Sequence, residues 1–244
     1  MNSISPNLNI MIKACEKASK ILIRDFGEIE KLQVSKKGPK DFVTSADRKV
    51  EKVLINELSK KNFSIISEEA GKLVNTDNKN FWIIDPIDGT MNFLHGIPHF
   101  CISIAFLNNQ EIVSGVIYDP IKNEIFYGEK NSGAFYNNQR IRVSKKNDFE
   151  KCLFGTNQNG IINKNLNCRI SGSAALDLAY VASGRLDGFF QKKLNIWDIA
   201  AGIVIISEAG GITSPINLKD IKNHTIIAAS ETIYQDLNKK LINF

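Results

Sequence analysis

Two aspartates at the end of an apolar segment are the residues of this chain best suited to chemistry. Residues 81–84 are aromatic and aliphatic, and they lead into Asp85, Pro86, Ile87 and Asp88. Two carboxylates three residues apart can converge on one point, where they repel each other unless a cation neutralises them. Because Mg²⁺ prefers oxygen ligands and commonly shares them with substrate phosphates, the pair is typical of a magnesium site.

The next two residues, Gly89 and Thr90, could hold the anion that such a cation would share. Glycine lets backbone N–H groups approach a ligand closely, and a helix that begins here would point its positive end at an anion. The Thr90 hydroxyl could also orient a water molecule. A metal pair beside a phosphate site is the outline of metal-assisted phosphoester hydrolysis, although Asp-Pro and Asp-Gly also mark ordinary surface turns.

Three more acidic residues stand beside apolar segments at two other places in the chain. Glu68 and Glu69 follow a short strand-like run, and Asp198 precedes a run of small residues. Taken singly, the glutamates are typical of a loop, and Asp198 is typical of a helix N-cap or first turn. Taken together with Asp85 and Asp88, they offer further oxygen ligands for a hard cation.

Helices and strands must position these acids, and the pattern of apolar residues predicts them. Helical spacing favours a helix over residues 8–26 that Gly27 closes, and Thr44 with Asp47 predicts the start of a second helix. The polar stretch 36–39 and the polar segment 157–167 are predicted as irregular. We expect strands at 63–66, 81–84 and 225–228, an antiparallel meander over 100–143, helices at 173–182 and 198–209, and a terminal helix capped by Ser230. This order favours layered sheets and helices over a barrel or a bundle.

Composition narrows the class of protein. The 244 residues are 43% hydrophobic and 23% charged, so the chain is too apolar to be disordered, and no run approaches the ~18 residues that span a bilayer. Without a recognisable signal peptide, we expect a cytoplasmic protein. The net charge of +5 is spread over isolated residues and pairs, so nucleic-acid binding is not expected. The four scattered cysteines predict free thiols.

Five segments of the chain resemble the inositol monophosphatase family, whose members are Mg²⁺-dependent and in part lithium-sensitive. Residues 82–93 match its signature W-x-[IV]-D-P-[IL]-D-G-T-x-N-F, and residues 197–211 resemble W-D-x-A-A-G followed by E-A-G-G. The segments DFVTSAD, SEEAG and SGSAALDLAYVASGRLDG are also similar and occur in the family's order. The resemblance implies an α+β fold, a layered αβαβα sandwich of the sugar-phosphatase type. We expect a half at 1–147 that carries most metal ligands and a half at 148–244 that carries Asp198, without a flexible linker.

The resemblance also implies roles for single residues. Two Mg²⁺ ions would share Asp85 as a bridging ligand, and a weaker third ion would bind near Glu68. The metal ligands would be Glu68, Asp85, the Ile87 carbonyl, Asp88 and Asp198. The attacking water would be held and deprotonated by the catalytic residues Asp47 and Thr90. The substrate would contact Gly89, Thr90, Ala174, Gln191 and Asp198.

We therefore expect Mg²⁺-dependent hydrolysis of a small polyol or sugar phosphate monoester, first of all myo-inositol 1-phosphate, by a homodimer. Two departures keep other substrates open: Gln191 replaces the family's usual glutamate, and residues 155–167 are too few and too polar for the family's helix. The alternatives are fructose-1,6-bisphosphatase, histidinol-phosphatase or nucleotide 3′-phosphatase activity. A regulatory RNA- or transcription-associated protein on the same fold is a further alternative.

Overall fold

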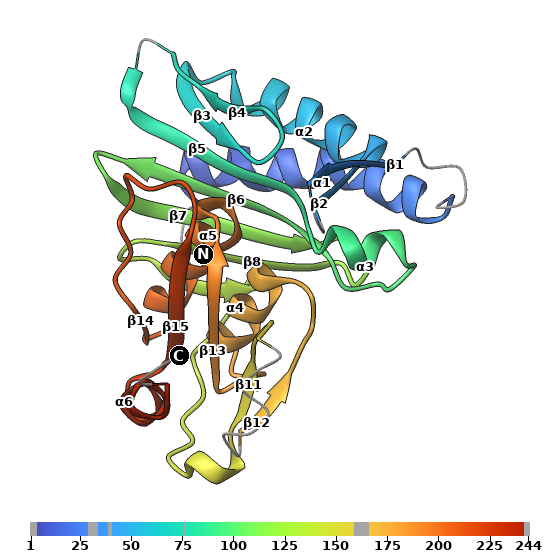
Figure 1. Ribbon diagram of the computed structural model, residues 1–244. Helices are drawn as coiled ribbons and strands as arrows, with labels where there is room; N and C mark the ends of the chain where they lie inside the picture. The colour runs from blue at the N-terminus through green and yellow to red at the C-terminus, as the bar shows by residue number, and fades with distance from the viewer. Residues whose placement is uncertain (1–3, 29–33, 39–40, 76, 159–165, 242–244) are drawn as a thin grey trace.

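The structure, a computed structural model, describes residues 4–28, 34–38, 41–75, 77–158 and 166–241. Its largest sheet has eight strands in the order β10-β9-β8-β7-β6-β5-β3-β4 (Figure 1). All neighbours in it are antiparallel except β3 and β5. The strands are β3 Phe63–Ser67, β4 Gly71–Leu73, β5 Asp77–Asp88, β6 Cys101–Asn108, β7 Glu111–Asp119, β8 Glu124–Glu129, β9 Gly133–Tyr136 and β10 Gln139–Arg140.

Tight turns explain why β6 to β10 form a meander. Two residues, Asn109 and Gln110, join β6 to β7 with positive φ angles of 48° and 66°. Asn137 and Asn138 join β9 to β10 with φ angles of 43° and 66°. Two successive residues with positive φ match the right-handed twist of paired strands, and asparagine tolerates that conformation. The predicted antiparallel meander is therefore confirmed.

A second sheet has five strands in the order β12-β11-β13-β15-β14. The strand β11 is parallel to both of its neighbours, whereas β15 is antiparallel to both of its own. These strands are β11 Leu153–Gly155, β12 Asn167–Arg169, β13 Gly188–Leu194, β14 Gly211–Thr213 and β15 His224–Ser230. The predicted strand at 225–228 is confirmed as part of β15.

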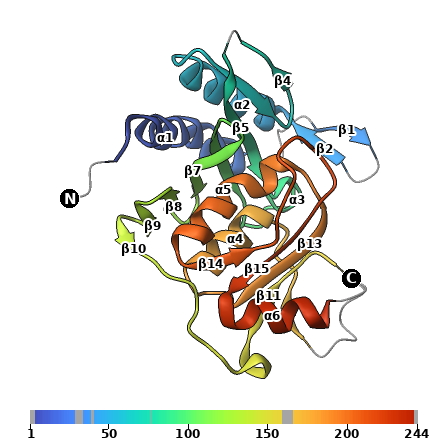
Figure 2. The ribbon, with the colours of Figure 1, turned by 90° about the vertical axis from the view of Figure 1, so that its left-hand side faces the viewer.

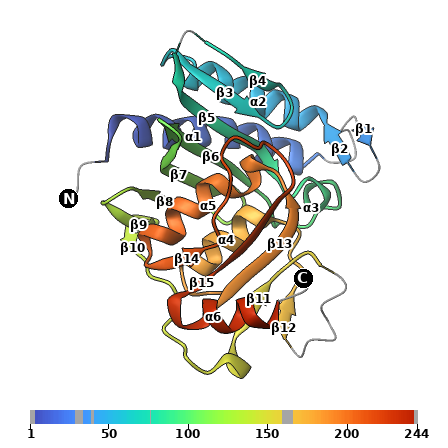
Figure 3. The same ribbon diagram turned by 60° about the vertical axis from the view of Figure 1, so that its left-hand side comes forward.

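Helices lie on both sides of each sheet, as Figures 1 and 3 show. Buried side chains of α1 and α2 pack on one face of the eight-stranded sheet, and those of α4 and α5 fill the space between the two sheets. The helix α6 covers the far face of the smaller sheet. The order of layers is helix, sheet, helix, sheet, helix, so the predicted αβαβα sandwich is confirmed. The helices are α1 Pro6–Phe26, α2 Ser45–Leu58, α3 Thr90–Leu94, α4 Ala174–Ala182, α5 Ile196–Glu208 and α6 Glu231–Lys240.

Close packing of α5 against the eight-stranded sheet brings its first turn to the acidic end of β5. A Cβ atom on Gly115 of β7 would lie 2.7 Å from the Cα atom of Ala201, so only glycine allows this approach. The Ser103 hydroxyl of β6 donates to the Trp197 carbonyl at 3.3 Å, which ties the start of α5 to the sheet. The helix therefore holds Asp198 beside strands that are distant in sequence.

One expectation about local structure was wrong, and another was confirmed only in part. Residues 36–38 were expected in a loop, but they belong to β1 Val34–Gly38, which pairs with β2 Asp41–Thr44 in a hairpin at one side of the molecule (Figure 2). A lysine-rich strand has no alternation of apolar residues that would predict it. Ser230 stands at the N-cap of α6, but its hydroxyl makes no capping hydrogen bond.

Other expectations lie partly outside the described residues. Pro39 and residues 159–165 of the polar segment belong to this group. The division at residue 147 stays a prediction, although the eight-stranded sheet uses residues up to 140 and the smaller sheet uses residues from 153 onward. In the described part of the chain, no helix combines the length and the apolar character required to cross a membrane.

Candidate metal and phosphate site

Three distant segments bring four acids to one end of β5. The parallel pairing of β3 with β5 places Ser67 beside Ile84, so that Glu68 follows at the height of Asp85. The Glu68 N–H donates to the Ile84 carbonyl at 3.3 Å, and the Glu68 side chain acts on the Asp85 carboxyl. From α5, Asp198 adds a third segment, and its charge acts on Asp85 as well.

A bulge in β5 explains how Asp85 and Asp88 reach the same place. Residues three apart in a regular strand point to opposite faces. Between the pairs Asp85–Ser103 and Asp88–Cys101, however, β5 contains one residue more than β6. Such a bulge re-aims side chains, and here both aspartates are buried, with 2% and 9% of their surface exposed. The Asp-Pro-Ile-Asp segment is therefore a buried strand end and not a surface turn.

Burial and mutual repulsion disfavour the ionised form of these acids. Burial raises the pKa of Asp85 well above its usual range, and the negative charges of Glu68, Asp88 and Asp198 raise it further. Burial also raises the pKa of Asp88, although hydrogen bonds from Ser173 and from α4 backbone amides oppose the shift. The pKa of Asp198 is raised by burial and by the charge of Asp88. A divalent cation would relieve this repulsion, because it stabilises all of the carboxylates at once.

The donor set fits a hard cation, but its coordination shell is not complete. Within the described ranges, no three Asp, Glu, His or Cys side chains already converge closely enough to hold an ion. Oxygen atoms of two acids are engaged by other donors: Asp198 Oδ2 accepts from the Asn195 N–H at 2.7 Å, and Asp88 Oδ2 accepts from Ser173 Oγ at 2.5 Å. The acids that gather around Asp85 supply only oxygen ligands, which suits Mg²⁺.

The residues expected to handle water and phosphate lie next to this cluster. Thr90 Oγ1 donates to the Ile87 carbonyl at 3.0 Å and lies 3.5 Å from Asp47 Oδ1. Asp47, in the first turn of α2, is 1% exposed. Gly89 precedes α3 with a φ angle of 98°, and a Cβ atom there would lie 3.0 Å from the His99 carbonyl. Only glycine suits this position, which brings the backbone close to the acids.

Two predicted substrate contacts come from α4 and β13. Ala174 begins α4 next to Asp88, because the following amide, that of Ala175, donates to Asp88 Oδ2 at 2.7 Å. Gln191 is half-buried in β13, two residues after Phe189, which packs with α4 and α5. Since alternate residues of a strand share a face, Gln191 lies on the side of β13 that faces these helices. Its role in substrate binding stays a prediction.

Sequence reasoning missed two residues that support the acids. Glu51 of α2 is 7% exposed, and its Oε1 accepts hydrogen bonds from Ser67 Oγ and from the amides of Glu69 and Ala70. It therefore holds the turn that carries Glu68. Its spacing four residues after Asp47, on the same face of α2, could have revealed it. Ser173 was expected only as a helix start.

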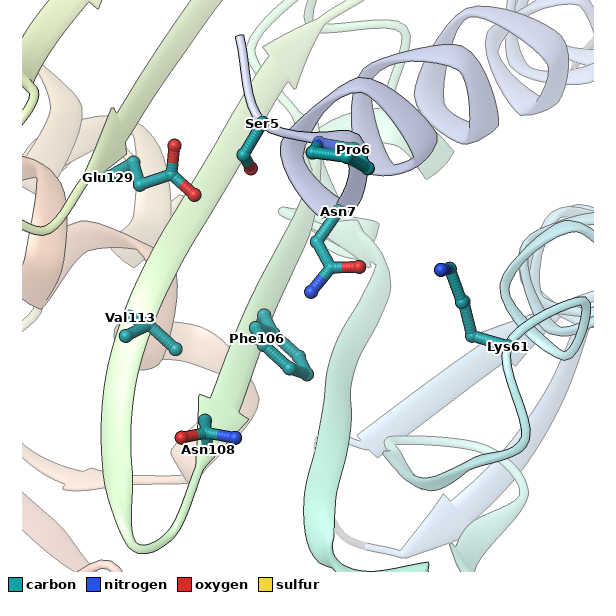
Figure 4. A pocket seen from close by; sticks show the side chains of 8 residues that line it. All are labelled: Ser5, Pro6, Asn7, Lys61, Phe106, Asn108, Val113 and Glu129. Carbon is teal, nitrogen blue, oxygen red and sulfur yellow. The ribbon is translucent and has the colours of Figure 1, made fainter.

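The pocket shown in Figure 4 is separate from this cluster. It has a volume of about 340 Å³ and lies where β6 turns into β7, because its residue Asn108 pairs with Asn80 near the start of β5. The acids stand at the other end of the same strand. The pocket is lined by Ser5, Pro6, Asn7, Lys61, Phe106, Asn108, Val113 and Glu129. With a single carboxylate, it offers no comparable metal site.

Comparisons with known proteins agree with the resemblance seen in the sequence. A family model described as the inositol monophosphatase family matches residues 4–243. The chain is 43% identical to an inositol-1-monophosphatase of Mesorhizobium japonicum, over 95% of this chain and 94% of that protein. It is 40% identical to a Nus factor SuhB of Escherichia coli, over 86% of this chain and 85% of that protein.

Solved structures agree as well. The extragenic suppressor protein suhB from Bartonella henselae superimposes with a TM-score of 0.92 at 43% identity, over 98% of this chain and 99% of that one. The match of the family model extends over nearly the whole sequence, including every acid described above. This chain belongs to the inositol monophosphatase family.

Proposed function

We propose that the protein hydrolyses a small polyol or sugar phosphate monoester in a Mg²⁺-dependent reaction, with myo-inositol 1-phosphate as its substrate. The observation that carries the proposal is the gathering of Glu68, Asp88 and Asp198 around the buried Asp85. Relatives at 39–43% identity that are named inositol-1-monophosphatase support the choice of substrate.

In this proposal, two Mg²⁺ ions, and a weaker third near Glu68, are held by Glu68, Asp85, the Ile87 carbonyl, Asp88 and Asp198. When bound, the ions neutralise the phosphate dianion, make a water more acidic and stabilise the leaving oxygen. The residues of the chain do the positioning. Thr90 Oγ1 orients the attacking water, and Asp47 Oδ1, 3.5 Å from Thr90 Oγ1, accepts the proton.

The substrate is then oriented by groups beside the cluster. Backbone amides of Gly89 and Thr90 bind the phosphate, and Ala174, Gln191 and Asp198 contact the polyol. Gln191 accepts hydrogen bonds through its side-chain oxygen, but it also donates, unlike a glutamate. Because of this difference, the site could also bind substrates whose hydroxyl groups are arranged differently from those of inositol.

Phosphate release from a panel of substrates tests the proposal. The panel contains myo-inositol 1-phosphate, fructose 1,6-bisphosphate, histidinol phosphate and 3′-phosphoadenosine 5′-phosphate, each with Mg²⁺ and with a chelator. We expect the highest kcat/KM for myo-inositol 1-phosphate and no release without Mg²⁺. Preference for another member of the panel would correct the substrate, whereas release that is unaffected by the chelator would refute the metal assignment.

A second function follows from the relatives named Nus factor SuhB, which are as much as 40% identical. We expect a transcription-associated role to be independent of the acids. RNA binding measured over a salt series, with Asp88→Asn beside the wild type, separates the two roles. We also expect a cytoplasmic homodimer, and sedimentation analysis would check the dimer.

A further inference from the structure

We propose that Ser173 is a positioning residue that orients Asp88 and so sets the affinity of the site for Mg²⁺. The inference rests on the proposed function, in which Asp88 is a metal ligand. Ser173 lies 85 residues from Asp88 in sequence and is itself 2% exposed. It belongs to the segment before α4, whereas Asp88 ends β5.

Two hydrogen-bond donors hold one oxygen of the Asp88 carboxylate. Ser173 Oγ donates to Asp88 Oδ2 at 2.5 Å, and the Ala175 N–H donates to the same oxygen at 2.7 Å. Cys101 Sγ approaches it at 3.8 Å. Because both short hydrogen bonds end on Oδ2, the carboxylate cannot rotate freely, and we assign Oδ1 to the cation.

The Ser173 hydroxyl is committed to this hydrogen bond. It accepts from the Leu176 N–H at 3.3 Å as the N-cap of α4. A hydroxyl has a single proton to donate, and the Ser173 hydroxyl donates it to the Asp88 carboxylate. The hydroxyl thus connects the start of α4 to the end of β5.

Neighbouring contacts fix the position of Ser173. Its amide donates to Ser171 Oγ at 3.3 Å, and the Ser171 carbonyl accepts from Asn92 Nδ2 of α3 at 2.8 Å. The same Asn92 nitrogen also donates to the His99 carbonyl at 2.8 Å. The segment before α4 is therefore attached to the loop that follows the two aspartates.

Loss of such an outer hydrogen bond typically weakens metal binding by about 10–100-fold, because the ligand is no longer held in its binding orientation. We expect this loss for Ser173→Ala, measured as the Kd for Mg²⁺ by titration calorimetry without substrate. Ser173→Thr keeps the hydroxyl and is expected to bind Mg²⁺ within about threefold of the wild type.

Ser5→Ala is the matched control for the loss of a helix cap. Ser5 Oγ accepts from the Leu8 N–H at 3.2 Å at the start of α1, as Ser173 does at the start of α4, but Ser5 lies at the separate pocket of Figure 4. Both alanine variants lose a cap, so both are expected to have lower thermal stability. Only Ser173→Ala is expected to have a weakened Kd for Mg²⁺.

Phosphate release adds a second measurement. Ser173→Ala is expected to require about 10–100-fold more Mg²⁺ for half-maximal activity, with the KM for myo-inositol 1-phosphate at saturating Mg²⁺ little changed. A Kd for Mg²⁺ in Ser173→Ala equal to that of the wild type and Ser5→Ala would overturn the proposal. If Ser173→Ala does not fold, Ser173→Gly, which also removes the hydroxyl but is tolerated at a helix N-cap, is judged by the same criterion.

The calorimetric result separates this inference from the proposed function. A wild-type protein that binds Mg²⁺ but releases no phosphate would refute the proposed reaction. The comparison of Mg²⁺ affinities would still decide the role of Ser173.

Discussion

At the scale of single residues, opposing effects act on the ionisation of the Asp88 carboxyl. Its Oδ2 accepts two short hydrogen bonds, while burial beside Asp85 and Asp198 still raises its pKa. The hydrogen bonds favour the ionised form of Asp88, and burial disfavours it. A bound cation shifts this balance toward the ionised carboxylate.

Asp88→Asn is therefore expected to lower kcat by about 10³-fold or more, because a neutral amide is a poor substitute for a carboxylate on Mg²⁺. Without Mg²⁺, the Tm should not fall, since the change removes one charge from a repelling cluster. Phosphate release and calorimetry measure the two effects. Asp236→Asn, at an exposed site of α6 with an ion pair at 3.7 Å, is the control and should leave both unchanged. Full activity in Asp88→Asn would refute its assignment as a ligand.

At the scale of elements, α2 supports the turn between β3 and β4 through Glu51. Glu51→Ala removes the acceptor of three hydrogen bonds, so we expect kcat/KM to fall by about 10–100-fold and the free energy of unfolding by about 1–3 kcal/mol. Glu51→Gln keeps an oxygen acceptor and should stay close to the wild type. Urea unfolding and phosphate release would show this difference, and equal activity of the two variants would contradict the supporting role.

The ion pair between the buried Asp187 and the exposed Lys146 makes a pH-dependent link between elements. Asp187 Oδ2 accepts from Lys146 Nζ and from the Leu153 N–H of β11, both at 2.8 Å. Burial by itself would raise the pKa of Asp187, but these hydrogen bonds and one from Ser144 outweigh it and lower the pKa. A lowered pKa stabilises the fold above the unfolded-state pKa of about 3.9, and this contribution is lost as the pH falls through the folded-state pKa.

We therefore expect Asp187→Asn to unfold at lower urea concentration than the wild type at pH 7. The two midpoints should begin to approach each other as the pH falls below about 3.9, and they should meet only below the lowered folded-state pKa, where the wild-type carboxyl is protonated as well. Asp148→Asn, at an exposed ion pair with Lys151, serves as the control and should show little change. A difference between Asp187→Asn and the wild type that persists undiminished at pH 2 would rule out the ionised carboxylate as its source.

Helices and strands could be predicted where the residues that determine them are close together in the sequence. The apolar spacing of α1 and α2 and the asparagine turns of the meander are local, and these elements were predicted correctly. The hairpin of β1 and β2 carries no alternation and was missed. The spacing of Asp85 and Asp88 indicated convergence, but not the bulge that produces it. The bond between Ser173 and Asp88 depends on the order of layers, which no local pattern contains.

At the scale of the whole molecule, the acids from three segments should make stability depend on Mg²⁺. A ligand that binds only the folded state stabilises it by RT ln(1 + [L]/Kd), about 2.7 kcal/mol at 100 times Kd. Calorimetric scans should show a Tm that rises with Mg²⁺ in the wild type and returns with a chelator. Asp85→Asn, which replaces the central acid, should show no such rise. The same rise in Asp85→Asn would place the stabilising ion elsewhere.

The distance between layers is the last determinant of the site, because Asp198 reaches it from α5 while Asp85 belongs to the sheet. Gly115→Ala would place a Cβ atom 2.7 Å from both the Cα and the O atom of Ala201, so the helix must move away from the sheet. Overpacking of this kind costs about 1–3 kcal/mol, or a few degrees in Tm. The same shift moves Asp198 away from Asp88, so we expect weaker Mg²⁺ binding by calorimetry. Gly27→Ala, whose Cβ atom would meet its nearest neighbour at 3.4 Å, is the control. A Gly115→Ala protein with a lower Tm but an unchanged Kd for Mg²⁺ would show that the site tolerates a shift between the layers.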